Sequence, residues 1–167
     1  MSDEHVKSCE GPPRALLMPA ITVETEVRCT PEQLFDVITD LRGQDKWLTP
    51  SSAYRGTQDI SPEPLEVGTT YREPGLAGVR NGTVVELERP TTVAFHQPMT
   101  LRFHAGTIDI LMRYTLAPAG KATHLRRTVT LGIPWTLKPL QPVLIRAVRH
   151  ESERTLRALK AHGDGLG

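Results

Sequence analysis

The sequence predicts an α+β domain in which a curved antiparallel sheet is wrapped round one long C-terminal helix. Three observations predict this class. A strand with period-two patterning, 20–27, runs directly into a capped helix, 30–39. Segments punctuated by Pro and Gly between residues 54 and 131 indicate several antiparallel strands. One amphipathic helix, 140–162, closes the chain. A sheet curved round a helix tends to leave a cavity, so an internal small-molecule pocket is also expected.

Length and charge narrow the possible functions. The 167 residues suit one domain, expected at 20–162, with flexible tails at 1–19 and 163–167. The 20 basic and 19 acidic side chains leave a net charge of +1, so nothing indicates a nucleic-acid partner. No apolar run approaches the ~20 residues that span a bilayer, and the N-terminus lacks the apolar stretch of a signal peptide. We therefore expect a cytoplasmic protein without stable membrane insertion.

The first strand and helix carry the clearest local signals. Within 20–27 the odd positions are mostly apolar and the glutamates point outward, which is typical of a half-buried strand. Thr30 can cap the following helix, and Gln33 completes a capping box. A second short helix is expected at 40–47, before Pro50.

The middle of the chain predicts a series of strands whose registers between 54 and 100 stay open. Gly106 lies within the longest one and is expected to form a bulge or bend. Asn81-Gly82 is an alternative position for a hairpin turn. A turn is expected over 117–122. The predicted strands are 54–60, 69–73, 79–88, 92–97, 101–116 and 123–132.

The last helix has a clear apolar face. Prolines at 134, 139 and 142 confine its start, and Gly163 is expected to end it. Basic and acidic side chains cover its other faces, which favours a solvated surface. The apolar face consists of Leu140, Leu144, Val148, Leu156 and Leu159.

Three stretches resemble a known family. The segment VETEVRCTPEQLFDVITDLRGQDKW (23–47) is similar to the opening of the START-like, helix-grip (SRPBCC) superfamily. The hairpin ELERPTTVAF (86–95) and the helix end LRALK (156–160) are also similar. The superfamily includes polyketide cyclase/dehydrase-like and lipid-transfer proteins. The resemblance implies a helix-grip fold over about 20–162 and a polyketide, lipid, isoprenoid or similar ligand. It does not imply one activity, because the superfamily includes enzymes, carriers and binding modules.

Strand parity distinguishes Arg127 and Tyr114. Even positions from 108 to 116, including Tyr114, are apolar or aromatic and should face inward. The odd positions of 123–131 place Arg127 on the same inward face. A charge there must be paired, hydrated or presented to a ligand. Two alternatives stay open: an ion pair with a carboxylate such as Glu86, or a cavity arginine that, with Tyr114, orients an oxygen-bearing ligand.

Further positions complete the predicted ligand site. Trp47 and Trp135 flank the helices, where a pocket mouth would lie, and Leu144 and Val148 should press into the sheet or the pocket. The remaining candidates come from the strands and are Ile110, Met112 and Phe95.

No motif of metal binding or catalysis is present. Cys9 and Cys29 lack metal or redox spacing, and a disulfide between them is not expected in a reducing compartment. His96 and His104 lie on predicted neighbouring strands, but ordinary surface or core roles account for them. His104 and Asp109 are separated by an odd gap, which puts them on opposite strand faces. We therefore expect no metal and no cofactor, and no catalytic dyad is recognisable.

The leading hypothesis is therefore binding of a hydrophobic or aromatic small molecule in an internal cavity. The alternative is an aromatase/cyclase-type enzyme in which Arg127 and Tyr114 polarise a carbonyl and shuttle a proton. A third hypothesis, a protein-interaction adaptor, requires a filled core and a large exposed apolar patch. The oligomeric state stays open.

Overall fold

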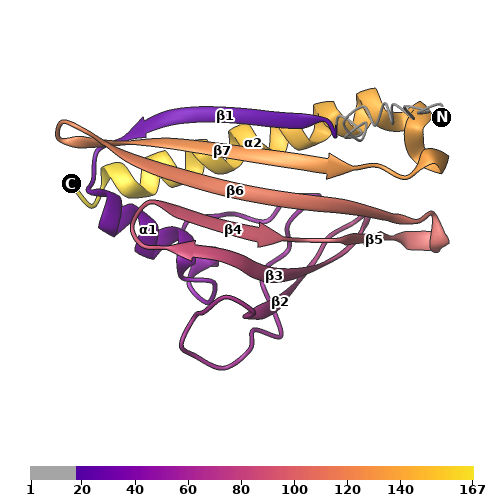
Figure 1. Ribbon diagram of the computed structural model, residues 1–167, viewed down its shortest axis with the longest axis horizontal. Coiled ribbons are helices and arrows are strands. Elements are labelled where there is room, and N and C mark those ends of the chain that lie inside the picture. The colour runs from indigo at the N-terminus through magenta and orange to yellow at the C-terminus, as the bar shows by residue number, and fades with distance from the viewer. Residues whose placement is uncertain (1–17) are drawn as a thin grey trace, which may run out of the picture.

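A seven-stranded antiparallel sheet and the long helix α2 form the body of the protein (Figure 1). The computed structural model describes residues 18–167. The strand order is β1-β7-β6-β4-β3-β2, and β5 pairs with both β3 and β6. The strands are β1 (Ala20–Val27), β2 (Thr70–Pro74), β3 (Gly78–Glu88), β4 (Thr92–His96), β5 (Met99–Leu101), β6 (Thr107–Ala119) and β7 (Ala122–Gly132).

Two α-helices and three short 3₁₀ helices complete the fold, so the predicted α+β class is confirmed. In Figure 1 α2 runs behind β1 and β7, and α1 lies near its C-terminal end. The helices are α1 (Pro31–Thr39), η1 (Gln44–Lys46), η2 (Arg102–His104), η3 (Trp135–Leu140) and α2 (Gln141–Asp164).

The predicted start of α1 is confirmed in detail. The backbone N–H of Gln33 donates to Oγ1 of Thr30 at 3.2 Å, and the backbone N–H of Thr30 donates to Oε1 of Gln33 at 3.0 Å. This capping box satisfies two amides that the helix itself cannot pair. It lets β1 pass into α1 after a short turn, so that Leu34, Phe35 and Ile38 reach the core.

The predicted strand at 54–60 is wrong. This segment is a loop that touches the sheet through one isolated bridge, in which Gln58 and Arg72 exchange backbone hydrogen bonds of 2.7 and 2.8 Å. Gly56 and Asp59 have φ angles of +98° and +49° on either side of the bridge. Left-handed residues at both ends prevent the extended backbone from continuing.

The predicted long strand at 101–116 is confirmed only from residue 107 onward, as part of β6, because the chain reverses near its predicted start. Residues 102–104 form η2, and Gly106 has a φ of +119°. The reversal makes β5 and β6 neighbours, with Met99 opposite Ile108. Gly106 therefore lies in the turn between η2 and β6, so the predicted bend is present and the predicted bulge is not.

Several element boundaries differ from the predictions. The β6–β7 turn is reduced to Gly120 and Lys121, and only three residues of the predicted helix 40–47 become η1. The Asn81-Gly82 pair lies inside β3, where a Cβ at Gly82 would collide with the ring of Tyr71.

The long helix passes the predicted stop at Gly163 and ends at Asp164, two residues beyond the expected end. Cys29 is a buried free thiol, whereas Cys9 and most of the predicted N-terminal tail lie outside the described residues.

Candidate ligand-binding site

A partly open cavity of about 250 Å³ lies between the sheet and the N-terminal half of α2. Its walls are mainly apolar. They come from β6 through Ile108, Ile110 and Met112, from β7 through Val129 and Leu131, and from α2 through Leu144, Ala147 and Val148. Polar side chains gather at one part of the wall and are Arg80, Gln97, Arg127, Glu151 and Ser152.

The pairing of β6 with β7 determines which side chains enter the cavity. The two strands are in register along their length, with Met112 opposite Val129 and Tyr114 opposite Arg127. Alternate residues of both strands are buried, as their parity predicts. Arg127 therefore lies on the same face as its apolar neighbours.

Arg127 is the most unusual group in this wall. It is 7% exposed, and its guanidinium carbon lies 5.4 Å from the centre of the Tyr114 ring. The ring face attracts the cation, but Nε and Nη1 are both buried without a hydrogen-bond partner. Burying donors in this way costs free energy unless another molecule accepts from them.

The carboxylate proposed as a partner for Arg127 binds elsewhere. Oε2 of Glu86 lies 2.6 Å from Nη2 of Arg113, and Oε2 of Glu73 lies 2.9 Å from Nη2 of Arg80. Among residues 18–167, no carboxylate lies within ion-pair distance of Arg127. The ion pair with Glu86 is therefore ruled out as the explanation of the buried charge.

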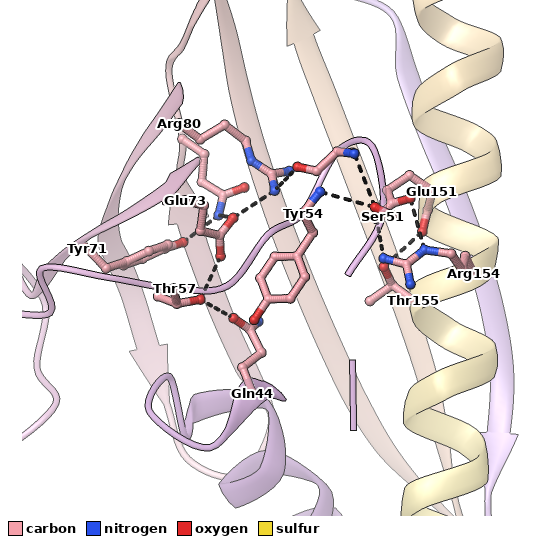
Figure 2. A network of polar contacts seen from close by, with 12 residues as sticks. Gln44, Ser51, Tyr54, Thr57, Tyr71, Glu73, Arg80, Glu151, Arg154 and Thr155 are labelled. Carbon is pink, nitrogen blue, oxygen red and sulfur yellow. Dashed lines mark hydrogen bonds and ion pairs between the residues drawn. The ribbon is translucent and has the colours of Figure 1, made fainter. Parts of the chain in front are cut away.

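A polar network on β2, β3 and the 51–57 loop borders the cavity (Figure 2). Its centre is Glu73, which is 4% exposed and bound to Arg80. Nε2 of Gln97 donates to the hydroxyl of Tyr71 at 2.6 Å and to Oε2 of Glu73 at 3.3 Å. These contacts provide partners for the buried carboxylate, in contrast to Arg127.

A second carboxylate, Glu151, ties the 51–57 loop to α2. Arg154 donates to it at 2.6 and 3.0 Å, and Oγ of Ser51 donates to it at 3.1 Å (Figure 2). The same Ser51 oxygen accepts the backbone N–H groups of Ala53 and Tyr54. This arrangement closes one side of the cavity with a loop that has no regular structure of its own.

Two titratable groups at this end, Glu151 and Tyr114, have shifted pKa values. Burial raises the pKa of Glu151, but hydrogen bonds from Arg154 and Ser51 outweigh it and bring that pKa below its ordinary value. Burial raises the pKa of Tyr114 above its ordinary value, and the charge of Arg127 opposes this only in part. Glu151 is therefore anionic and Tyr114 neutral at physiological pH.

Ser152 is a cavity residue that the sequence analysis missed. It is 1% exposed, lines the cavity, and its Oγ has no hydrogen-bond partner. The signal was present in the sequence, because Leu144, Val148 and Ser152 follow at intervals of four and share one helix face. A small hydroxyl side chain on this otherwise apolar helix face indicates that the face borders a cavity at this position.

The structure separates the predicted site residues into two groups. Ile110, Met112, Arg127, Leu144 and Val148 line the cavity, and Tyr114 lines a small adjoining recess together with Arg127.

The other three predicted residues do not line the cavity. Phe95 packs edge-on between Tyr71 and Tyr114, at centroid distances of 5.9 and 6.4 Å. Trp47 is half-buried against the core. Trp135 is 83% exposed, because η3 turns Leu137 inward in its place.

Neither a metal centre nor a spanning helix is found among residues 18–167. No three His, Cys, Asp or Glu side chains come together there as a metal site requires. No helix in this range is long and apolar enough to cross a membrane.

The family profile described as polyketide cyclase / dehydrase and lipid transport matches residues 18–164. The chain belongs to this family. It has the helix-grip fold of START-like proteins, in which a curved sheet and a long C-terminal helix face each other. No curated protein sequence matches the chain significantly.

Solved structures with the same fold have low sequence identity. The protein TTHA0849 from Thermus thermophilus is 16% identical, with a TM-score of 0.67 over 89% of this chain and 99% of that one. A START superfamily protein from Mycobacterium smegmatis is 14% identical, with a TM-score of 0.64 over 89% and 99% of the two chains. The Aha1 dimer from Colwellia psychrerythraea is 19% identical, with a TM-score of 0.64 over 88% and 97%. These likenesses concern the fold alone.

Proposed function

We propose that the protein binds a hydrophobic or aromatic small molecule of the polyketide, lipid or isoprenoid kind, with an oxygen of the ligand accepting hydrogen bonds from Arg127. One observation carries this proposal. Two buried nitrogens of Arg127 lack partners at the polar end of a cavity whose other walls are mainly apolar. A carbonyl, phenolate or carboxylate would satisfy them, and the hydroxyl of Ser152 is available as a further contact.

The shape and chemistry of the cavity support a ligand with an apolar body and one polar end. Ile110, Met112, Val129 and Leu144 offer contacts to a flat ring or an alkyl chain, and they provide no hydrogen bonds. Arg127 offers donors only, so the polar end must be an acceptor. The Tyr114 ring, over which the Arg127 guanidinium lies, helps to orient that guanidinium.

The same groups favour binding over catalysis. In the aromatase/cyclase alternative, Tyr114 would have to exchange a proton with the substrate, and burial raises its pKa away from neutrality. Glu151 is a poor base for the opposite reason, because its pKa is lowered by Arg154 and Ser51 against the effect of burial. The adaptor alternative requires a filled interior, which is at odds with a cavity of about 250 Å³.

Calorimetric titration with 2-naphthoate and with naphthalene tests the role of Arg127. The two probes share an aromatic body, and only the first carries an acceptor. Arg127→Leu should weaken 2-naphthoate binding about 10- to 150-fold, the range for a charge-assisted hydrogen bond, and leave naphthalene binding unchanged. Arg113→Leu, on the exposed face of the same sheet, is the matched control. Equal losses for both probes, or for both variants, would contradict the proposal.

Native mass spectrometry of protein purified from its own host identifies the ligand class. A co-purifying molecule should be apolar with at least one oxygen acceptor, and it should be absent from Arg127→Leu. A retained ligand without an acceptor would remove Arg127 from the binding site.

A further inference from the structure

Large apolar side chains are exposed on segments that adjoin the cavity wall. Phe103 on η2 is 96% exposed and Trp135 on η3 is 83% exposed. Three further exposed side chains, Leu76, Leu140 and Val143, come from the β2–β3 turn, the end of η3 and the first turn of α2. We call these five residues the apolar rim.

The segments that carry the rim meet at one end of the molecule. A Cβ at Gly106, beside η2, would lie 3.8 Å from Cγ of Pro134, which directly precedes Trp135. The backbone N–H of Arg102 donates to the carbonyl of Ala77 at 3.0 Å, which joins η2 to the β2–β3 turn. Figure 1 has η3 and the β5–β6 reversal at the same, right-hand end. Leu76 of the rim lines the cavity, as do Leu101 and Leu144, which directly adjoin η2 and Val143 in the chain, so the rim borders this part of the cavity wall.

Phe103 is held in this position at an energetic cost. Phe103 and His104 have φ angles of +59° and +55°, in the left-handed region that residues other than glycine rarely adopt. Strain of this kind persists where the surrounding structure imposes it and is concentrated at functional sites. Here it is combined with full exposure of a phenyl ring, which is also unfavourable in water.

The charge of this end is one-sided, although the whole chain is nearly neutral. The stretches 74–85, 97–108 and 133–150 contain no Asp or Glu. They carry four exposed basic residues, none of which forms an ion pair with a described residue: Arg102, Lys138, Arg146 and Arg149. All 19 Asp and Glu side chains of the chain lie in other segments, and Asp109, which directly follows one of these stretches, is bound to His96, so the unpaired charge of these stretches is basic.

We propose that the apolar rim and these four basic residues dock the protein onto an anionic membrane surface, with the cavity mouth facing the bilayer. Aromatic and aliphatic side chains enter the interface between headgroups and acyl chains, and Lys and Arg bind the headgroup phosphates. Docking is peripheral, because the described residues hold no spanning helix. It would let an apolar ligand pass between bilayer and cavity without crossing water.

Co-sedimentation of the full chain with vesicles tests the proposal. Vesicles of phosphatidylcholine mixed with phosphatidylglycerol should bind the protein at low salt, and added salt should weaken this binding without abolishing it, because salt screens the basic side chains and not the apolar rim. Vesicles of phosphatidylcholine alone should bind it at least about ten-fold more weakly, because each basic side chain near an anionic surface is worth roughly five-fold in affinity.

Two pairs of substitutions separate the apolar and the basic contributions. Arg146→Gln with Arg149→Gln should lower affinity for the mixed vesicles by roughly 20-fold. Phe103→Ser with Trp135→Ser should abolish the binding that survives at high salt. The controls lie outside the mouth segments on exposed positions: Lys121→Gln with Arg157→Gln for charge, and Val67→Ser with Leu166→Ser for apolar surface. Melting curves check that each variant is folded.

Three results would overturn the proposal: no binding to either vesicle, equal losses in the controls, or a rim-dependent dimer of the full chain, detected by light scattering, without vesicle binding. Docking does not depend on the ligand proposed above. Arg127→Leu should therefore leave vesicle binding unchanged, so that failure of one proposal is distinguishable from failure of the other.

Discussion

The two halves of α2 meet the sheet in different ways. In the C-terminal half Thr155, Leu156, Leu159 and Gly163 are buried, and the helix packs closely on β1 and α1. In the N-terminal half, from residue 141 to residue 151, every side chain is half-buried or exposed, and the cavity takes the place of a core. The C-terminal half of α2 therefore packs against the protein itself, and the N-terminal half faces the cavity that we propose for the ligand. Substitutions in the C-terminal half should mainly lower stability, and substitutions in the N-terminal half should mainly affect ligand binding.

The largest expected effect distinguishes the buried Arg127 from Arg80, which is half-buried. Arg80→Leu should lower the free energy of unfolding by about 3–5 kcal/mol, because it leaves the buried Glu73 carboxylate without its cationic partner. Arg127→Leu should leave stability unchanged or raise it by about 1–3 kcal/mol, because no carboxylate is stranded and two unpartnered donors are removed. Urea unfolding of both variants measures the difference. A large loss of stability for Arg127→Leu would show that its role is structural.

A second pair of variants compares the two halves of the helix directly. Leu159→Ala should cost about 2–5 kcal/mol, because Leu159 is fully buried in the close-packed half. Leu144→Ala should cost less than about 2 kcal/mol, because part of its surface already borders open space. Denaturant titrations of the two variants give both values. Equal costs would mean that the cavity is filled at Leu144 in solution.

Substitution of Gly163 tests how closely the C-terminal half of α2 packs on β1. A Cβ at this position would collide with Cγ1 of Val27, which is fully buried on β1. Gly163→Ala should therefore destabilise the protein by about 1–3 kcal/mol, although alanine is the better helix former. Thermal melting measures the effect, with Ala161→Gly at an exposed position on the same turn as a control for propensity. An increase in melting temperature for Gly163→Ala would indicate a looser contact.

The smallest expected effect is the pH dependence that comes from Glu151. Burial alone would raise its pKa, but Arg154 and Ser51 bring it below the ordinary value of 4.5. The folded state therefore binds fewer protons than the unfolded state, so this contribution to stability is present above pH 4.5 and is lost as the pH falls through the folded pKa. Melting temperatures measured from about pH 7 to about pH 3 should fall less steeply for Glu151→Gln than for the wild type. Parallel curves would show that Glu151 has an unperturbed pKa.

Local sequence patterns predicted more of the fold than of the candidate site. The capping box at Thr30, the parity of β6 and β7 and the apolar face of α2 depend on neighbours within a few residues, and all three are present. The exception is Leu140, which the pattern predicts on that face but which lies in η3 and is 52% exposed. Residues 54–60 form a loop and not the predicted strand, because left-handed residues at Gly56 and Asp59 interrupt a composition that suits a strand. Predictions for aromatic side chains were the least reliable, since Phe95 and Trp135 have similar apolarity and opposite exposure.

The α+β class, the first strand and helix, and the inward direction of Arg127 follow from the amino-acid pattern alone, because backbone periodicity decides which face a side chain occupies. The groups that surround Arg127 do not follow from that pattern. Whether Glu86 or an empty space lies opposite its guanidinium depends on strand registers and on the path of α2, which bring together residues far apart in the chain. The burial of Ser152 beside the cavity and the exposure of the apolar rim have the same cause. Whether a side chain is buried depends on which distant residues pack against it, and no local sequence pattern encodes this.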